Sequence, residues 1–230
     1  MWIFNRKNSK LKALALGIGA ALFSGGVASA DIMIDSFSAP PGALIVLPGA
    51  SATTSVTQVV PSVFGGNRTV TIDRVAGPST IFVEVNPSLA LDGYATVNTP
   101  SQTTANFQFH YHDGPSFSFD MSAEKYFVMK LIKAEYPGVL EASVKSGGVW
   151  ESKSVAFSAG SSNVVVPFTL YSSTNFADVN GLKFTIYGSE DFDASIDSIS
   201  TMVPVPSAVW AGLGLIGVVG IRRMRRFQNA

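Results

Sequence analysis

The sequence contains no cysteine and only two histidines among its 230 residues. The lack of cysteine excludes disulfide frameworks, thiolate zinc sites, cysteine-ligated iron–sulfur clusters and cysteine nucleophiles. Charged residues are also scarce, at 14%, whereas 47% of the residues are hydrophobic. A chain of this composition is not intrinsically disordered as a whole, and its length allows a core large enough to fold without cross-links.

Basic residues are rare in the middle of the chain. Sixteen basic and sixteen acidic residues balance overall, but half of the basic residues stand near the two ends. Residues 31–202 contain all sixteen acidic residues against eight basic ones, a net charge of −8. Nucleic-acid binding depends on clustered Lys and Arg, so we expect no nucleic-acid partner.

Residues 1–30 have the features of a secretory signal peptide. A basic segment precedes an apolar stretch from Leu11 to Phe23, interrupted only by Lys12. Ala28 and Ala30 then form an A-x-A cleavage site. We expect cleavage after Ala30. A first transmembrane helix is the alternative, but the run before the site is rich in Gly and Ala and ends in small residues.

Residues 203–230 combine a short motif, an apolar stretch and a basic end. Val203, Pro204, Pro206 and Ser207 belong to the motif, and Ala208–Ile221 is uncharged. From Val203 this run is just long enough for a transmembrane helix, which needs about 20 apolar residues. Lys and Arg favour the cytoplasmic side of a membrane, so we expect residues 31–202 to lie outside. The basic residues that would hold the end inside are Arg222, Arg223, Arg225 and Arg226.

This order resembles the PEP-CTERM sorting signal that Gram-negative bacteria pair with exosortase, a membrane transpeptidase-like enzyme. Family members carry Pro-Glu-Pro; here Val205 replaces the Glu, as in V-P-x-P variants that continue with Ala-Val-Trp, matched by Ala208-Val209-Trp210. The resemblance implies a transient stay in the inner membrane, processing by exosortase, and delivery to the cell surface or the extracellular medium. A permanent single-pass anchor is the alternative.

Residues 31–202 show the period-2 alternation of half-buried strands, and Pro, Gly, Asn or Asp separates the runs. Many short strands with such turns predict an all-β chain forming a single two-sheet β-sandwich, jelly-roll-like in layout. The expected strands are Ile32–Phe37, Ala43–Leu47, Ser55–Val60, Thr69–Val75, Ile81–Val85, Tyr94–Val97, Thr104–Tyr111, Ser116–Met121, Tyr126–Lys133, Val139–Val144, Lys153–Phe157, Asn163–Leu170, Gly181–Tyr187 and Ala194–Ile199.

The first and last of these strands share the sequence Ile-Asp-Ser, and we expect them to pair. With the run Phe184–Tyr187 and the closing strand Ile196–Ile199, the layout resembles galactose-binding-like and carbohydrate-binding-module β-sandwiches. This resemblance implies association with a glycan, by analogy only.

Two groups of residues are candidates for metal binding. His110 and His112 flank Tyr111, and an H-x-H pair on a strand can bind zinc or copper if other strands add ligands. The acidic run Glu190–Asp193, with Asp197 and Asp35 nearby, has oxygen ligands suited to calcium. Neither group forms a complete motif, so an exposed strand end and a solvated acidic turn are the simpler interpretations, and we expect no cofactor.

Catalytic motifs are missing from the sequence. Glycoside hydrolysis needs two carboxylates across a cleft, and the acids Glu124, Glu135, Glu141 and Glu151 do not share the spacing of a common strand face. No G-x-S-x-G elbow, H-E-x-x-H helix or P-loop is present either. We therefore expect a protein that is not an enzyme.

Aromatic residues are the better indication of binding. Phe107, Phe109 and Tyr111 alternate on one expected strand, and Phe117 and Phe119 alternate on the next. A stripe of this kind is usually the face that packs into the core. A platform for stacking sugars needs exposed rings near turns instead, and the candidates for it are Tyr94, Trp150 and Tyr171.

These observations favour a non-enzymatic exported protein, processed at both ends and placed at the cell surface or in the exopolysaccharide matrix. Its β-sandwich is expected to be structural or to associate with extracellular polysaccharide. Two alternatives remain open. One is a secreted polysaccharide hydrolase with a carboxylate pair that the sequence does not reveal, and the other is a permanently anchored, adhesin-like ectodomain.

Overall fold

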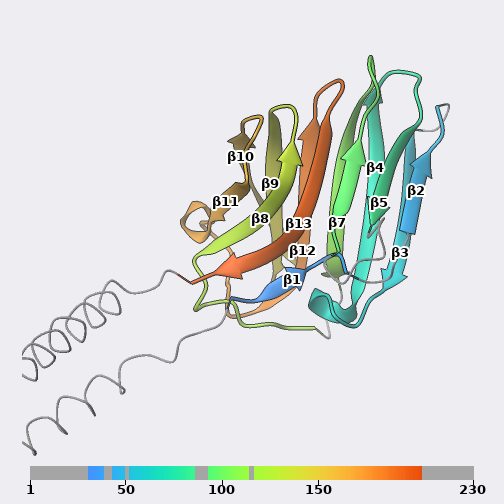
Figure 1. The fold of residues 1–230 in the computed structure, drawn as a ribbon. Helices are drawn as coiled ribbons and strands as arrows, with labels where there is room; N and C mark the ends of the chain where they lie inside the picture. The colour runs from blue at the N-terminus through green and yellow to red at the C-terminus, as the bar shows by residue number, and fades with distance from the viewer. Residues whose placement is uncertain (1–30, 39–42, 50–51, 86–92, 114–116, 204–230) are drawn as a thin grey trace, which may run out of the picture. The chain divides into compact units, whose positions relative to one another are not determined.

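The computed structural model describes residues 31–203 apart from 39–42, 50–51, 86–92 and 114–116. In this range the chain forms two antiparallel sheets around one core (Figure 1). Residues Ala30–Val203 make up one compact unit. The expected all-β, two-sheet sandwich is thus confirmed. The expected signal peptide and the segment 204–230 lie outside the described residues.

Each sheet has a simple strand order. The seven-stranded sheet runs β11 (Asn163–Pro167), β8 (Tyr126–Ala134), β13 (Asp193–Met202), β6 (Ala95–Asn98), β5 (Ile81–Val85), β2 (Ala43–Leu47), with β1 (Met33–Asp35) paired to β13. The six-stranded sheet runs β10 (Val149–Phe157), β9 (Gly138–Ser146), β12 (Val179–Gly188), β7 (Thr104–Asp113), β4 (Asn67–Ala76), β3 (Thr53–Val59). Two short 3₁₀ turns, η2 (Phe64–Gly66) and η3 (Phe168–Leu170), complete the described elements.

Most of the expected strands are present, and β2 and β5 match them residue for residue. The strand expected at Ser116–Met121 is wrong: Phe119 makes only an isolated bridge, to Val179. β7 pairs instead with β4 and β12. The alternation of Phe117 and Phe119 arises because both rings pack edge-on against the buried Phe64. A loop segment that packs two rings against the core therefore shows the same two-residue spacing as a strand.

The core lies between the two inner faces. On β7, Phe107, Phe109 and Tyr111 are fully buried, as the aromatic stripe predicted. The intervening residues of the strand face outward, because successive side chains of a strand point to opposite sides of the sheet. The same alternation holds along β5 and β6, so two stacked sheets explain the period-2 pattern of the sequence.

The predicted pairing of the first and last strands is confirmed. β1 runs antiparallel to β13, with Met33 opposite Ser200, and Ile34 and Ile196 are fully buried. The contact continues to the ends of the described chain, where the backbone N–H of Val203 donates to the Asp31 carboxylate at 3.2 Å. Both ends of the sandwich therefore lie together.

A buried ion pair ties β1 to the opposite sheet. Asp35 accepts from Arg68 Nη1 at 2.7 Å and from the Tyr111 hydroxyl at 2.9 Å. The Arg68 guanidinium also donates to Gln58, at 3.0 Å from Nε and 2.8 Å from Nη2. Asp35 and Arg68 are 1% and 0% exposed. We call this cross-sheet contact the Asp35 clamp.

Burial raises the pKa of the Asp35 carboxyl, and the adjacent guanidinium and hydrogen bonds lower it only in part. Burial and the neighbouring carboxylate likewise raise the pKa of Tyr111 well above its usual value. β4 begins at Asn67, two residues before the strand expected at Thr69–Val75, and Arg68 in this extension is fully buried.

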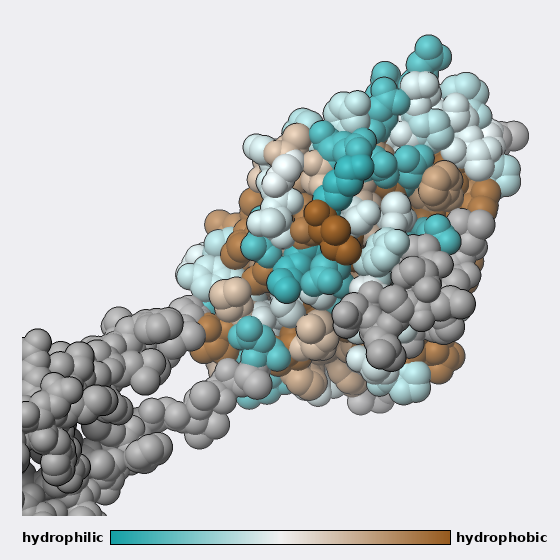
Figure 2. All heavy atoms as spheres, in the orientation of Figure 1, coloured by the Kyte–Doolittle hydropathy of each residue, from teal (hydrophilic) through white to brown (hydrophobic). Residues whose placement is uncertain are grey.

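The outer surface shows no large apolar area in the view of Figure 2. Hydrophilic residues form a band across the visible face, and hydrophobic residues appear in small separate groups. Among the described residues, no helix has the length and apolar character needed to cross a membrane.

Candidate functional site

The outer face of the six-stranded sheet is rich in hydroxyl groups. We call this surface the polar face and define it by two rows of aligned residues. The first row is Ser152, Ser143, Lys183, His110, Thr69 and Thr57. The second row is Ser154, Glu141, Thr185, Gln108, Thr71 and Ser55.

Short hydrogen bonds fix several of these side chains across the strands. Thr57 and Thr69 hydroxyls lie 2.8 Å apart, and Ser143 and Ser152 hydroxyls also lie 2.8 Å apart. Cross-strand pairs of this kind hold neighbouring side chains in defined positions. The polar face is therefore an ordered array of donors and acceptors.

Trp150 lies at one end of the polar face. It stands at the start of β10, opposite Lys145 of β9, and its ring reaches β12, where a Cβ on Gly181 would come within 3.1 Å of the indole. Lys183 Nζ is 3.9 Å from the ring centroid, and the His110 ring meets the indole edge-on at 5.7 Å. The glycine makes room for the indole, and the lysine contributes a cation–π contact.

Tyr187 is the second aromatic residue on this side of the sheet. It is 37% exposed and stands opposite Val139 of β9. Burial and then the charge of Glu141 raise the pKa of its hydroxyl. Because β9 carries the partners of Tyr187 and Trp150 six residues apart, the two rings are separated by about 20 Å along the sheet.

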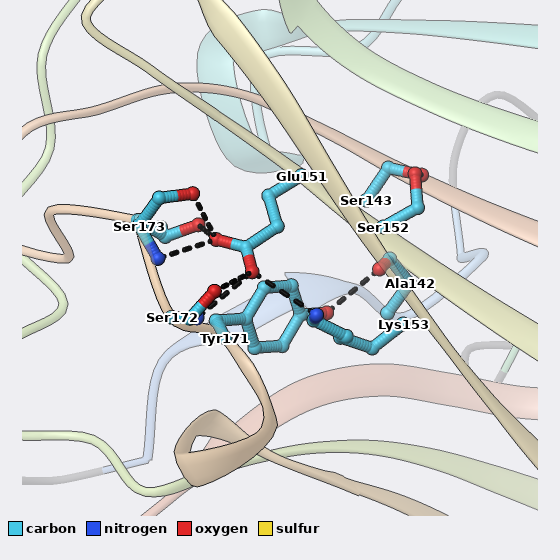
Figure 3. Close-up of polar contacts among 9 residues, drawn as sticks. Ala142, Ser143, Glu151, Ser152, Lys153, Tyr171, Ser172 and Ser173 are labelled. Carbon is cyan, nitrogen blue, oxygen red and sulfur yellow. Dashed lines mark hydrogen bonds and ion pairs between the residues drawn. The ribbon is translucent and has the colours of Figure 1, made fainter.

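On the inner side of β10, Glu151 binds the loop that follows η3. One carboxylate oxygen accepts from the N–H and hydroxyl of Ser172, at 2.8 and 3.2 Å. The other accepts from the N–H and hydroxyl of Ser173 and from the Thr174 hydroxyl, at 2.9, 2.8 and 2.9 Å. Lys153 adds an ion pair at 3.1 Å. Figure 3 shows the carboxylate pointing into this ring of donors.

We call this second contact the Glu151 clamp, since it joins the edge strand β10 to the loop after β11 of the other sheet. Partial burial raises the pKa of Glu151, but the donors of Ser172–Thr174 outweigh that effect and hold the pKa well below its usual value. Beside it, the Tyr171 hydroxyl donates to the carbonyl oxygen of Ala142 at 2.7 Å. The clamp thus fixes the strand that presents Trp150 on its other side.

The two histidines are not brought together as a ligand pair. The register of β7 against β12 shifts next to His112, which has a φ of 34°. His110 packs against Trp150, whereas the His112 ring lies 4.4 Å from that of Phe117. The bulge at His112 breaks the simple alternation that the H-x-H spacing assumes.

The acidic residues considered for calcium are dispersed as well. Asp35 belongs to the buried clamp, and Asp197 forms an ion pair with Lys130 at 3.5 Å. Phe192, inside the acidic run, is fully buried. In the part of the chain that the structure describes, no three His, Asp or Glu side chains are placed to hold a metal ion.

The four glutamates considered for hydrolysis occupy separate environments. Glu124 is 2% exposed, and Glu135 pairs with Lys133. Glu141 lies on the polar face beside Tyr187, and Glu151 is held in its clamp on the inner side of the sheet. Glu141 and Glu151 thus face opposite sides of the six-stranded sheet.

Three rings were candidates for a sugar-stacking platform. The prediction is wrong for Tyr171, because this residue is 8% exposed and belongs to the core. Trp150 and Tyr94 are partly exposed. Sequence reasoning missed the Asp35 clamp, the Glu151 clamp and the setting of Trp150. Of these residues only Arg68 could have been found from the sequence. It lies two residues before Val70, so the alternation of the strand places its side chain on the same inward face.

No family model and no curated protein matches the chain. Among solved structures, the family 11 carbohydrate-binding module of a Clostridium thermocellum cellulase is 13% identical, with 77% of this chain and 97% of that chain covered and a TM-score of 0.37. A family 61 module in complex with β-1,4-galactotriose is also 13% identical, with coverages of 70% and 88% and a TM-score of 0.32. An exo-β-agarase is 10% identical, with coverages of 77% and 25% and a TM-score of 0.40.

The described part of the chain is an antiparallel two-sheet β-sandwich. The roles of its individual residues are argued from the contacts of this chain alone.

Proposed function

We propose that this protein is a non-enzymatic, exported protein that associates with extracellular polysaccharide through the polar face of its sandwich. The observation that carries the proposal is the indole of Trp150 at the end of an ordered, hydroxyl-rich sheet surface. Such a surface combines the two kinds of contact that a sugar chain can make. The ring packs against C–H groups, and the polar side chains exchange hydrogen bonds with hydroxyls.

The polar composition of the surface favours an extended chain over a small molecule. Small-molecule sites are concave and mostly apolar, whereas the polar face is a sheet surface covered by Ser, Thr and Gln. Its two aromatic rings, the partly exposed Trp150 and the exposed Tyr187, are separated by about 20 Å, the length of several sugar units. Each hydrogen bond contributes only about 0.5–1.5 kcal/mol, so many weak contacts along a polymer are required.

The absence of catalysis is part of the proposal. The glutamates that hydrolysis would need occupy separate environments, two of them engaged in the Glu151 clamp and the Lys133 ion pair. Retaining and inverting glycosidases place two carboxylates about 5 to 10 Å apart on either side of the scissile bond. A secreted hydrolase is the competing function, and the binding experiment includes a test for it.

Export and sorting belong to the same proposal. Cleavage after Ala30 releases the chain at Asp31, and an exosortase acts at the motif around Pro204, Pro206 and Ser207. The two ends of the sandwich lie together, at Asp31 and Val203, which supports processing of both from one side of the domain. The mature protein is then released to the cell surface or its polysaccharide matrix.

Binding is tested with residues 31–203, the compact unit that contains both sheets, on a panel of soluble polysaccharides by affinity electrophoresis and calorimetry. We expect Trp150→Ala to weaken binding by roughly tenfold, the loss of one aromatic contact of about 1.4 kcal/mol. Tyr136→Ala is the matched control, because Tyr136 is 41% exposed in the bend between β8 and β9 and belongs to neither row of the polar face. Equal affinity of both variants, or no binding by the wild type, contradicts the proposal.

The same preparations are assayed for new reducing ends. We expect none from any polysaccharide of the panel. Turnover that a single Glu→Gln change abolishes would replace the binding function with the hydrolase.

Sorting is tested by mass spectrometry of the mature protein from the native host. We expect its C-terminus near Val203–Ser207. Removal of Arg222, Arg223, Arg225 and Arg226 should leave the protein unprocessed or misoriented, because each charge costs about 2.5–3.5 kcal/mol to place in the membrane on insertion scales. Intact peptides from Ala211 to Arg222 in the wild type would support the permanent anchor instead.

A further inference from the structure

Strand β3 forms an open edge of the six-stranded sheet. Of the described strands only β4 pairs with it, and most of its seven residues are exposed. Val56 is 41% and Val59 is 78% exposed. Figure 1 shows β3 on the opposite side of the sandwich from β10 and β11. The backbone groups along this edge are available to another strand.

The other edges carry features that discourage pairing. β10 contains Glu151 and Lys153, and charges on an edge strand oppose association. β11 and β2 have five residues each; Pro167 is the last residue of β11, and Pro48 directly follows β2. β3 contains neither a charge nor a proline along its seven residues, Thr-Thr-Ser-Val-Thr-Gln-Val. Natural proteins seldom leave an edge of this kind without a partner.

We propose that β3 pairs antiparallel with β3 of a second copy of this chain, about a two-fold axis through Val56. In this register Ser55 stands opposite Thr57, and Thr54 stands opposite Gln58. Hydroxyl meets hydroxyl or amide, and no like charges face one another. The strand is therefore complementary to itself, as a two-fold interface requires.

The position of Val56 explains why the axis passes there. Its partner on β4 is Val70, which is fully buried, so Val56 lies on the inner side of the sheet at the open margin of the core. Pairing places the two Val56 side chains against each other and removes this apolar margin from water. Thr57 and Ser55 remain on the outer side.

The dimer joins two polar faces into one continuous surface. A single strand pair buries much less than the roughly 1,200 Å² of a stable interface, so the pairing is weak and depends on concentration. Two linked binding faces bind a polymer more tightly than one without any new sugar contact. Self-association is thus a property separate from glycan binding, and either one can fail alone.

The absence of cysteine permits a direct test with single-cysteine variants of the full chain in mild detergent. Opposite residues of an antiparallel pair are about 4.5–5.5 Å apart, which suits a disulfide. In the proposed register Val56→Cys faces its own copy. Val59→Cys lies about 20 Å from its copy, since the two are six residues apart along the strand. We expect roughly tenfold more cross-linked dimer from Val56→Cys, because disulfide geometry excludes the other pair.

Ser154→Cys, on the exposed edge strand β10, measures the cross-linking that arises from chance collisions.

Analytical ultracentrifugation measures the oligomeric state in a second experiment. Val56→Lys places two ammonium groups against each other and should abolish the dimer, whereas Ser154→Lys should not, and thermal melting confirms that both variants are folded. Similar cross-linking at all three cysteine positions, or a wild-type chain that stays monomeric at millimolar concentration, overturns the proposal.

Discussion

The Asp35 clamp and the Glu151 clamp perform the same task in opposite environments. Each uses one carboxylate to join the two sheets. Asp35 is fully buried and balanced mainly by Arg68, and burial raises its pKa. Glu151 is 13% exposed and surrounded by donors from three consecutive residues, which lower its pKa. The number of hydrogen-bond donors, compared with the loss of hydration, decides which direction prevails.

The comparison predicts that breaking the Asp35 clamp has the largest effect. Asp35→Ala removes the carboxylate partner of the buried Arg68 guanidinium, which still donates to Gln58. Removal of one partner of a buried ion pair costs about 3–5 kcal/mol. Urea unfolding of residues 31–203 measures this loss. A cost below about 1 kcal/mol would show that the pair is hydrated in solution.

Replacing both charges sharpens the same point. In Asp35→Leu/Arg68→Met no unpaired charge remains, and such replacements are often neutral or stabilising by about 1–4 kcal/mol relative to the ion pair. We expect the double variant to be more stable than Asp35→Ala in the same urea titration. If the double variant is the less stable of the two, the remaining contacts of Arg68, such as its hydrogen bonds to Gln58, stabilise the fold by more than its unpaired charge costs.

A smaller effect is expected at the Glu151 clamp. Glu151→Gln keeps the shape but replaces one accepting oxygen with a donor, so hydrogen bonds from Ser172 or Ser173 are lost. We expect a loss of about 1–2 kcal/mol, in the range of charge-assisted hydrogen bonds. For a chain of this size that lowers the melting temperature by roughly 3–8 °C. Glu135→Gln is the control, because its ion pair with Lys133 is exposed and should contribute little.

The smallest effect is the pH dependence of that difference. The pKa of Glu151 is lowered on folding, so its ionised form stabilises the fold above the unfolded-state pKa of about 4.3, and the contribution is lost as the pH falls. The difference in unfolding free energy between wild type and Glu151→Gln should be constant from about pH 7 to pH 5 and should shrink below about pH 4. A difference that does not change down to pH 3 would contradict an ionic role.

The sequence predicted the sandwich because alternation records which side of a sheet each residue faces. The pairing of β1 with β13 and the buried stripe of β7 followed from such local patterns. The setting of Trp150 did not, since it depends on the missing side chain of Gly181, which is distant in the sequence. The inward position of Arg68 was not predicted, because a charge at such a position is explained by its partner Asp35, which lies 33 residues away in the sequence.

The prediction of a strand at Ser116–Met121 was wrong for a related reason. An alternating pattern shows only that every second residue is buried. A loop segment that packs over Phe64 produces this pattern as well as a hydrogen-bonded strand does. The signal peptide predicted for residues 1–30 and the sorting signal predicted for residues 203–230 depend on composition and motif and remain predictions.

The meeting of the two ends also determines how the sandwich responds to force. The N–H of Val203 bonds to Asp31, the N–H of Ile32 donates to the Thr201 hydroxyl, and the N–H of Thr201 donates to the carbonyl of Ile32. A force that separates Asp31 from Val203 therefore breaks these hydrogen bonds one after another, starting from the ends of the chain. Tension applied only through the C-terminal end enters the domain along β13, so a domain held at that end keeps β1 in place under drag.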